Sequence, residues 1–94
     1  MMVGACVIEL HLPGVRSLKD KRRHIKPLLI RLQNEFNLAV AEIGYNNIWQ
    51  SAQIAIVGVA NNRAHVELQL QRAVAWIERN RPELDIVDYE IEWR

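Results

Sequence analysis

Residues 3–26 read VGACVIELHLPGVRSLKDKRRHIK and join an apolar run to a strongly basic one. The run from Val3 to Leu12 is rich in Val, Ile and Leu and ends at Pro13-Gly14, which predicts a well-buried strand. Ser17 supplies an N-cap hydroxyl, and Asp20 occupies the capping-box position three residues later. The stretch therefore predicts a strand that leads, through a short turn, into a helix.

Apolar residues continue beyond this start at helical spacing. At 100° per residue, five of them fall within roughly 40° of one direction: Leu18, Ile25, Leu29, Leu32 and Phe36. Pro27 falls on the opposite, wet side, where its ring is tolerated and bends a helix around a core. We expect one kinked amphipathic helix of about five turns rather than two short helices.

The rest of the chain predicts three strands and a second helix. Residues 38–43 form a short strand, residues 44–47 a turn, and residues 48–60 a long strand. Asn61-Asn62 is a natural N-cap for a second helix. Its predicted core stripe consists of Val66, Leu70, Ala73, Val74 and Ile77.

Residues 85–93 alternate as a strand with one wet face. Asp88, Glu90 and Glu92 occupy that face, and we expect the other face to pack on the core with Val87, Tyr89, Ile91 and Trp93. The order strand–helix–strand–strand–helix–strand predicts a single ferredoxin-like α+β domain over residues 1–94. Its four-stranded antiparallel sheet would carry both helices on one face.

Composition fits a soluble globular protein with 50% hydrophobic and 24% charged residues. Charge is unevenly divided, since residues 1–40 hold seven Lys/Arg against three Asp/Glu, and residues 41–94 hold five against eight. With no signal-like N-terminus or membrane-length apolar segment, we expect a cytoplasmic protein. The single Cys6 lies in an apolar run and is expected to be a small buried residue.

The second face of the predicted sheet is also apolar. Val3, Ala5 and Val7 alternate with the core residues of the first strand, as do Ala55, Val57 and Val59 in the third. A two-layer fold leaves this face uncovered. The pattern predicts a homo-oligomer, most simply a dimer, that acts through the open sheet face.

The basic segment supplies the candidate nucleic-acid-binding residues, which are Arg16, Lys19, Arg22, Arg23 and Lys26. The segment is either a phosphate-contacting stripe or a solvated helix face. Cations at a helix start are disfavoured by the macrodipole by a few tenths of a kcal/mol each, and this cost slightly favours a function for them. The predicted central strands contain no aromatic residue, which argues against base stacking on the sheet. Any RNA should therefore be bound by a helix or loop edge.

No catalytic, metal or cofactor motif accompanies this segment. The Pro13-Gly14 loop with Arg16 invites comparison with acylphosphatases, but the third strand lacks the asparagine that such chemistry requires. Glu9, His11, Glu90 and Glu92 show no ligand spacing and are expected to be solvated strand residues. We therefore expect no enzyme, metal or cofactor.

Trp49 either anchors a partner or covers the core beneath the hairpin.

Several short motifs, taken together, resemble the YlxP-like family, a small bacterial family catalogued as a domain of unknown function. They are the SLKDKR run at residues 17–22, VAEIG at 40–44, Trp49-Gln50 and the Asn61-Asn62 helix start. The resemblance implies a ferredoxin-like fold and carries over no catalytic residue. Because genes of the family often neighbour those for translation initiation and ribosome-binding factors, it also implies a role in ribosome assembly or RNA association.

Overall fold

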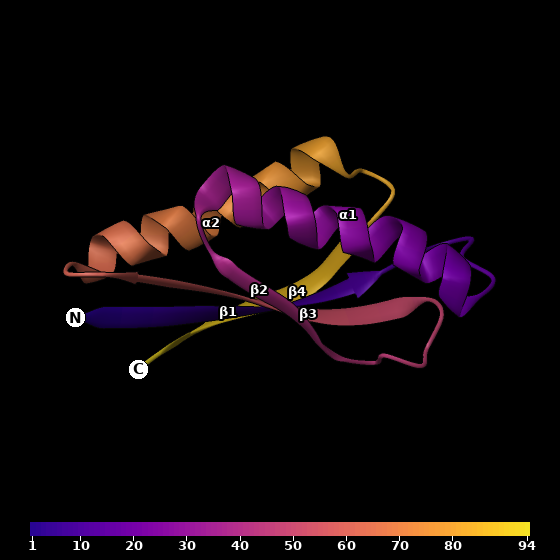
Figure 1. The fold of residues 1–94 in the computed structure, drawn as a ribbon, viewed down its shortest axis with the longest axis horizontal. Coiled ribbons are helices and arrows are strands. Elements are labelled where there is room, and N and C mark those ends of the chain that lie inside the picture. The colour runs from indigo at the N-terminus through magenta and orange to yellow at the C-terminus, as the bar shows by residue number, and fades with distance from the viewer.

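The computed structural model describes residues 1–94 and places two helices on one face of a four-stranded sheet (Figure 1). The elements follow one another as β1 (Met2–His11), α1 (Leu18–Phe36), β2 (Ala39–Gly44), β3 (Ser51–Ala60), α2 (Arg63–Asn80) and β4 (Asp85–Trp93). The strand order is β2-β3-β1-β4 and all neighbours are antiparallel. This is the ferredoxin-like arrangement that the sequence predicts.

Both helices begin at the predicted caps. Ser17 Oγ accepts a hydrogen bond of 3.0 Å from the Asp20 backbone, and Asn62 Oδ1 accepts one of 3.2 Å from His65. The first helix ends at Asn37, whose φ of 51° is the left-handed conformation that asparagine tolerates. Pro27 is exposed within a single continuous helix, as its position opposite the stripe predicts.

The core lies between the helices and the inner face of the sheet. Alternate residues of β1 and the predicted stripe of α2 are buried there, and all five stripe residues of α2 are confirmed. Gly4 and Gly58 pair across β1 and β3, directly beneath α2. A Cβ at Gly4 would lie 2.8 Å from Val66 Cγ1, so this glycine permits the close approach of α2 to the sheet.

The buried stripe of α1 differs in part from the predicted one. Ile25 and Leu32 are buried, whereas Leu18, Leu29 and Phe36 are half-buried at its margin. Leu28 and Lys21 are fully buried instead. The buried face is therefore turned by about 50° from the predicted direction, because the helix leans toward β2.

Two strand predictions need correction. Residues 48–50 do not extend β3; they belong to a turn in which the Ile48 N–H donates to the Tyr45 carbonyl at 3.0 Å. Val87 does not pack on the core, because a bulge leaves it without a partner between Leu10–Ile86 and Glu9–Asp88, and its side chain is 65% exposed. Tyr89 is also largely exposed, since β4 lies at the edge of the sheet beyond most of the helical cover.

The outer face of the sheet carries the apolar block that the alternation predicts. Cross-strand pairs share a face, and Val3–Val59, Ala5–Val57 and Val7–Ala55 are such pairs. On the other side of β1, the acidic row of β4 continues this face through Ala5–Glu92, Val7–Glu90 and Glu9–Asp88. Neither helix is long and apolar enough to cross a bilayer.

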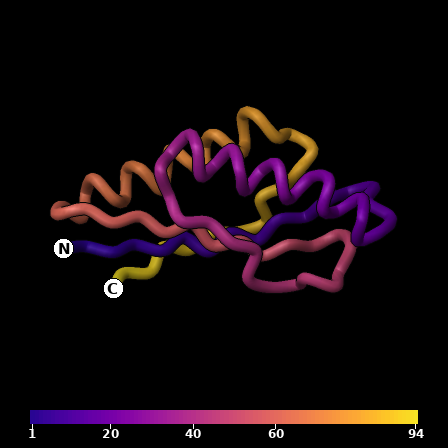
Figure 2. Tube along the Cα trace, viewed as in Figure 1, coloured from indigo at the N-terminus to yellow at the C-terminus, as the bar shows by residue number.

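The molecule has two distinct ends along its longest dimension of 42 Å. Both termini lie at one end of the trace, together with the start of α2 (Figure 2). The start of α1 and the loop between β2 and β3 lie at the other end (Figure 2). The basic segment therefore meets the β2–β3 loop (residues 45–50) at the end remote from the termini.

Cys6 is buried under the helices, and burial raises the pKa of its thiol from 9.0 to about 11. Between pH 9 and 11 the unfolded chain loses this proton while the folded chain keeps it, so the thiol's contribution to stability falls as pH rises. We expect the free energy of unfolding to drop by about 1 kcal/mol more in the wild type than in Cys6→Ala between pH 8 and pH 10. Urea unfolding at both pH values measures this, and parallel pH profiles would contradict the burial of the thiol.

Candidate nucleic-acid interface

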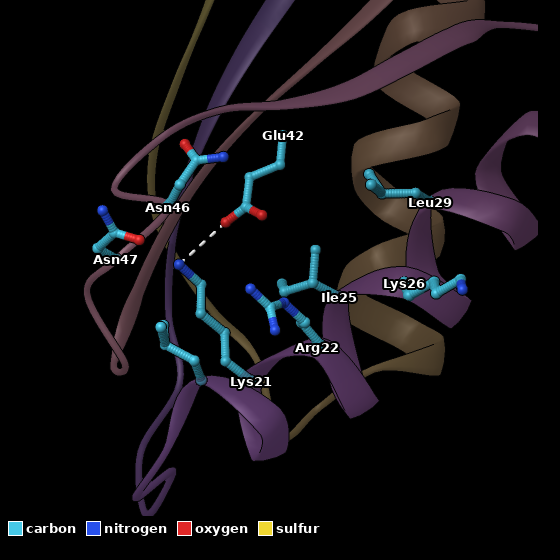
Figure 3. A pocket seen from close by; sticks show the side chains of 9 residues that line it. Lys21, Arg22, Ile25, Lys26, Leu29, Glu42, Asn46 and Asn47 are labelled. Carbon is cyan, nitrogen blue, oxygen red and sulfur yellow. Dashed lines mark ion pairs between the residues drawn. The ribbon is translucent and has the colours of Figure 1, made fainter.

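A buried ion pair joins α1 to the end of β2, next to the β2–β3 loop. Lys21 is only 2% exposed, and its Nζ lies 2.9 Å from Glu42 Oε2 (Figure 3). The same Nζ donates a hydrogen bond of 2.6 Å to the Tyr45 carbonyl. Glu42 reaches Lys21 because it pairs with Ile54 and so lies on the face of the sheet that carries the helices.

The loop is held to the start of α1 by further backbone contacts. The Leu12 N–H donates to the Gln50 carbonyl at 3.0 Å, and Gln50 Nε2 donates to the Val15 carbonyl at 3.2 Å. Tyr45 adopts a φ of 59°, which is uncommon for an aromatic residue, and the two hydrogen bonds accepted by its carbonyl hold it there. Residues 45–50 and 12–21 thus form one connected surface.

The loop presents apolar side chains to solvent. Trp49 is 51% exposed and does not cover the core, so the alternative of a core-covering indole is excluded. Ile48 is equally exposed beside it. The exposed indole lies on the same loop as Asn46 and Asn47, which line one cavity together with Arg22 and Lys26.

The five candidate cations are all exposed, but the structure divides them. Arg22 and Lys26 line a cavity between α1 and the loop, and Lys26 extends away from the Lys21–Glu42 pair (Figure 3). Arg23 lies on the other flank of the helix, in a depression that it shares with Arg81 and Glu83, and its Nη1 is 3.9 Å from Asp20. Arg16 follows Val15, which contacts the loop through Gln50.

Four of these cations have no carboxylate within 4.0 Å, namely Arg16, Lys19, Arg22 and Lys26. Lys21, the sixth cation of the segment, is neutralised by Glu42. Arg22 and Lys26 therefore bring uncompensated charge to the flank of α1 that faces the loop, whereas Arg23 lies on the other flank.

Sequence reasoning missed Lys21 and Glu42. Two features of the sequence could have identified them. Lys21 stands three residues after Leu18 and four before Ile25, within the apolar stripe. Glu42 stands two residues after Val40 and therefore shares the inward side of a strand with it. A lysine and a glutamate at inward positions of neighbouring elements indicate a buried pair, because neither is buried alone at acceptable cost. By contrast, no group of three or more His, Cys, Asp or Glu side chains is placed to hold a metal ion.

Comparison with known proteins confirms the resemblance indicated by the motifs. A family model described as "Protein of unknown function (DUF503)" matches residues 3–91. Over 92 residues the chain is 37% identical to the uncharacterized protein YlxP of Bacillus subtilis (strain 168), and the match covers 98% of this chain and 99% of that protein. The matched region includes the whole of the surface described above.

Removing Glu42 should destabilise the fold, because it leaves the Lys21 ammonium buried without its counter-charge. We expect Glu42→Ala to lower the free energy of unfolding by about 3 kcal/mol, the lower end of the range for breaking a buried pair, since Glu42 is 21% exposed. The double variant Lys21→Met/Glu42→Leu should recover much of this stability.

Chemical denaturation of the three proteins measures these effects. Arg23→Ala is the matched control, because its side chain is exposed and its contact with Asp20 is long; its effect should stay within about 0.5 kcal/mol. Equal stabilities for Glu42→Ala and Arg23→Ala would show that the ion pair is not what holds the loop to α1.

Proposed function

The chain belongs to the DUF503 family, and from the geometry of its basic end we propose that it is a non-enzymatic RNA- or ribosome-associated accessory protein that binds phosphates through the basic flank of α1. The observation that carries the proposal is the group of exposed cations without a carboxylate partner at the start of α1, opposite a loop that carries the exposed Trp49 and is hydrogen-bonded to α1 through Lys21. These groups bind and orient a ligand. A role in ribosome assembly accords with the expectation drawn from the resemblance.

The electrostatic support comes from the placement of the cations. Arg16, Lys19 and Arg22 stand at the positive end of the helix macrodipole, where each costs a few tenths of a kcal/mol unless an anion is nearby. None of the three has a carboxylate within 4.0 Å, and Asp20, the one acid of the first turn, lies closest to Arg23 and His24. A phosphate backbone supplies the missing anions and gains from both the side chains and the helix end.

The aromatic support comes from Trp49. Stacking of a base on an exposed aromatic side chain contributes about 1–3 kcal/mol and tolerates any base. The outer face of the sheet offers no comparable platform, since Ala and Val fill its centre and Asp88, Glu90 and Glu92 follow along β4. Single-stranded RNA is therefore the ligand that best suits the loop and helix end.

Alanine replacement of Arg22, Arg23 and Lys26 together should weaken binding of single-stranded RNA. In a salt series, the log–log slope of affinity against salt should become less steep by roughly 0.7 for each phosphate that the variant no longer neutralises. Since Arg23 faces the other flank, most of the effect should come from Arg22 and Lys26. Fluorescence anisotropy with labelled RNA, or sedimentation with ribosomal subunits, measures the effect.

A triple variant at Arg72, Arg79 and Arg94 is the matched control, because it removes the same charge from exposed positions outside the basic segment. Trp49→Ala should lower affinity without changing the salt slope, because it removes stacking and no charge. Unchanged RNA binding in the Arg22/Arg23/Lys26 variant would refute the proposal.

A second candidate function is supported by the outer face of the sheet. There the apolar block of Val3, Ala5, Val7, Ala55, Val57 and Val59 is continued by Ala39 and Ala41 of β2. The strands have 10, 6, 10 and 9 residues. At about 3.3 Å for each residue and about 4.8 Å between strands they give a face of about 550 Å², about two thirds of the roughly 800 Å² that each partner of a specific dimer buries. We propose a second copy of the chain as the occupant, with the acidic row of β4 at the rim of a homodimer.

Light scattering at micromolar concentration should then give a mass of about 22 kDa, twice the 10.9 kDa of the chain. Val57→Glu should convert the protein to a monomer, because it places a carboxylate at the centre of the apolar block. Ala75→Glu, on the exposed side of α2, is the control and should leave the mass unchanged. A wild-type mass of about 11 kDa would exclude the dimer.

A further inference from the structure

A cavity of about 210 Å³ separates α1 from the β2–β3 loop (Figure 3). Its helical wall has an apolar part, formed by Leu18, Ile25 and Leu29, and a basic part to which Lys21, Arg22 and Lys26 contribute. The volume corresponds to about seven water molecules at about 30 Å³ each, or to one planar bicyclic base. An apolar wall of this kind packs against the face of a flat ring.

The opposite wall is polar. Glu42, Asn46 and Asn47 line it and offer carboxylate and amide groups to a ligand edge (Figure 3). Glu42 Oε2 is buried and accepts no hydrogen bond of good geometry, so that its one polar contact is the ion pair with Lys21. Oε1, by contrast, is not among the buried unsatisfied atoms and makes no hydrogen bond, so its lone pairs remain available to a ligand in the cavity.

The charged side chains that line the cavity further limit the class of ligand that it can bind. Lys21 neutralises Glu42, so the carboxylate can accept hydrogen bonds without presenting net negative charge. Arg22 and Lys26, which also line the cavity, add positive charge. The complementary ligand has an apolar face, hydrogen-bond donors along one edge and an attached anionic group, which is the chemistry of a nucleotide.

We infer that this cavity receives one unpaired base of the bound RNA and prefers guanine. The N1–H and N2–H₂ groups of guanine lie side by side and can both donate to Glu42 Oε1, the oxygen that Lys21 leaves open, while the ring lies against the apolar part of the helical wall. Adenine presents the N1 acceptor at the same position and would face the carboxylate with like polarity. The inference rests on the proposed RNA binding, for which Arg22 and Lys26 would hold the adjoining phosphate.

Two measurements test the inference separately from the proposed function. In the first, free 5′-GMP and 5′-AMP are titrated into the isotopically labelled protein, and the side-chain amide signals of Asn46 and Asn47 are followed by NMR. These signals should shift with GMP at lower concentration than with AMP. In the second, uridine-tract RNA with one central guanine, inosine or adenine is compared by fluorescence anisotropy.

Guanine should be bound about 5- to 150-fold more tightly than adenine, the range that one good bidentate contact provides. Inosine, which lacks the N2 amino group, should fall between them. Glu42→Gln should abolish the preference, measured as the ratio of guanine to adenine affinity within the variant so that a general loss of RNA binding from the broken ion pair cancels. Glu67→Gln on the exposed side of α2 is the control and should keep the preference. If Glu42→Gln does not fold, Asn47→Ala should still reduce the guanine preference.

The outcomes distinguish the two proposals. RNA binding that depends on the basic flank, with equal affinity for guanine and adenine and no GMP-induced shift at Asn46 or Asn47, would overturn the inference and leave the proposed function standing. Selective GMP shifts without RNA binding would support the cavity as a nucleotide site and refute the proposed function. Neither RNA binding nor nucleotide shifts would overturn both.

Discussion

The ion pair between Lys21 and Glu42 is the interaction on which the candidate interface depends. A lysine at 2% exposure is retained in a fold of this size only when its charge is compensated and its N–H groups are bonded. Glu42 supplies the charge and the Tyr45 carbonyl accepts one hydrogen bond. Glu42 lies at the end of β2, and Tyr45 lies in the loop beyond it. The two contacts of the buried Lys21 ammonium therefore fix the position of the loop against α1.

The ion pair also removes one cation of the basic segment from the charge that is exposed to solvent. Of the six cations between residues 16 and 26, Lys21 is withdrawn into the structure, and Arg23 is turned toward Asp20 and the far flank of the helix. The other four face solvent without a carboxylate of their own. Arg22 and Lys26 lie across the cavity from the loop that carries Trp49, while the acids of β4 lie on the outer face of the sheet. The uneven division of charge along the sequence becomes a separation of charge in space.

Local patterns predict the element order and the caps, because these depend on neighbours in the chain. Spacing and side-chain chemistry are enough to identify Ser17, Asn62 and the stripe of α2. These local patterns do not predict how α1 is rotated about its axis. Leu28 is buried more deeply than Leu18 and Leu29 because the helix leans toward β2, and this contact joins segments that are distant in the sequence. The bulge at Val87 has the same origin, because it is defined by the register against Glu9 and Leu10. The sequence predicts the interface as a set of cations, whereas its cavity and its buried pair depend on the three-dimensional arrangement.

The two proposed surfaces are compatible within one assembly. The apolar block lies on the face of the sheet opposite the helices, whereas the basic flank belongs to α1 and to the end of the molecule remote from the termini (Figures 1 and 2). Pairing of two outer faces would give four layers, helix–sheet–sheet–helix, with both copies of α1 exposed. Each dimer would then carry two phosphate-binding ends on one rigid body. If a single RNA spans both, the second contact becomes intramolecular, and avidity can exceed the affinity of one end by about 10²–10⁴-fold without any new contact. Weak binding by the few cations of one chain would then suffice for a stable complex, which gives the open sheet face a direct part in RNA association.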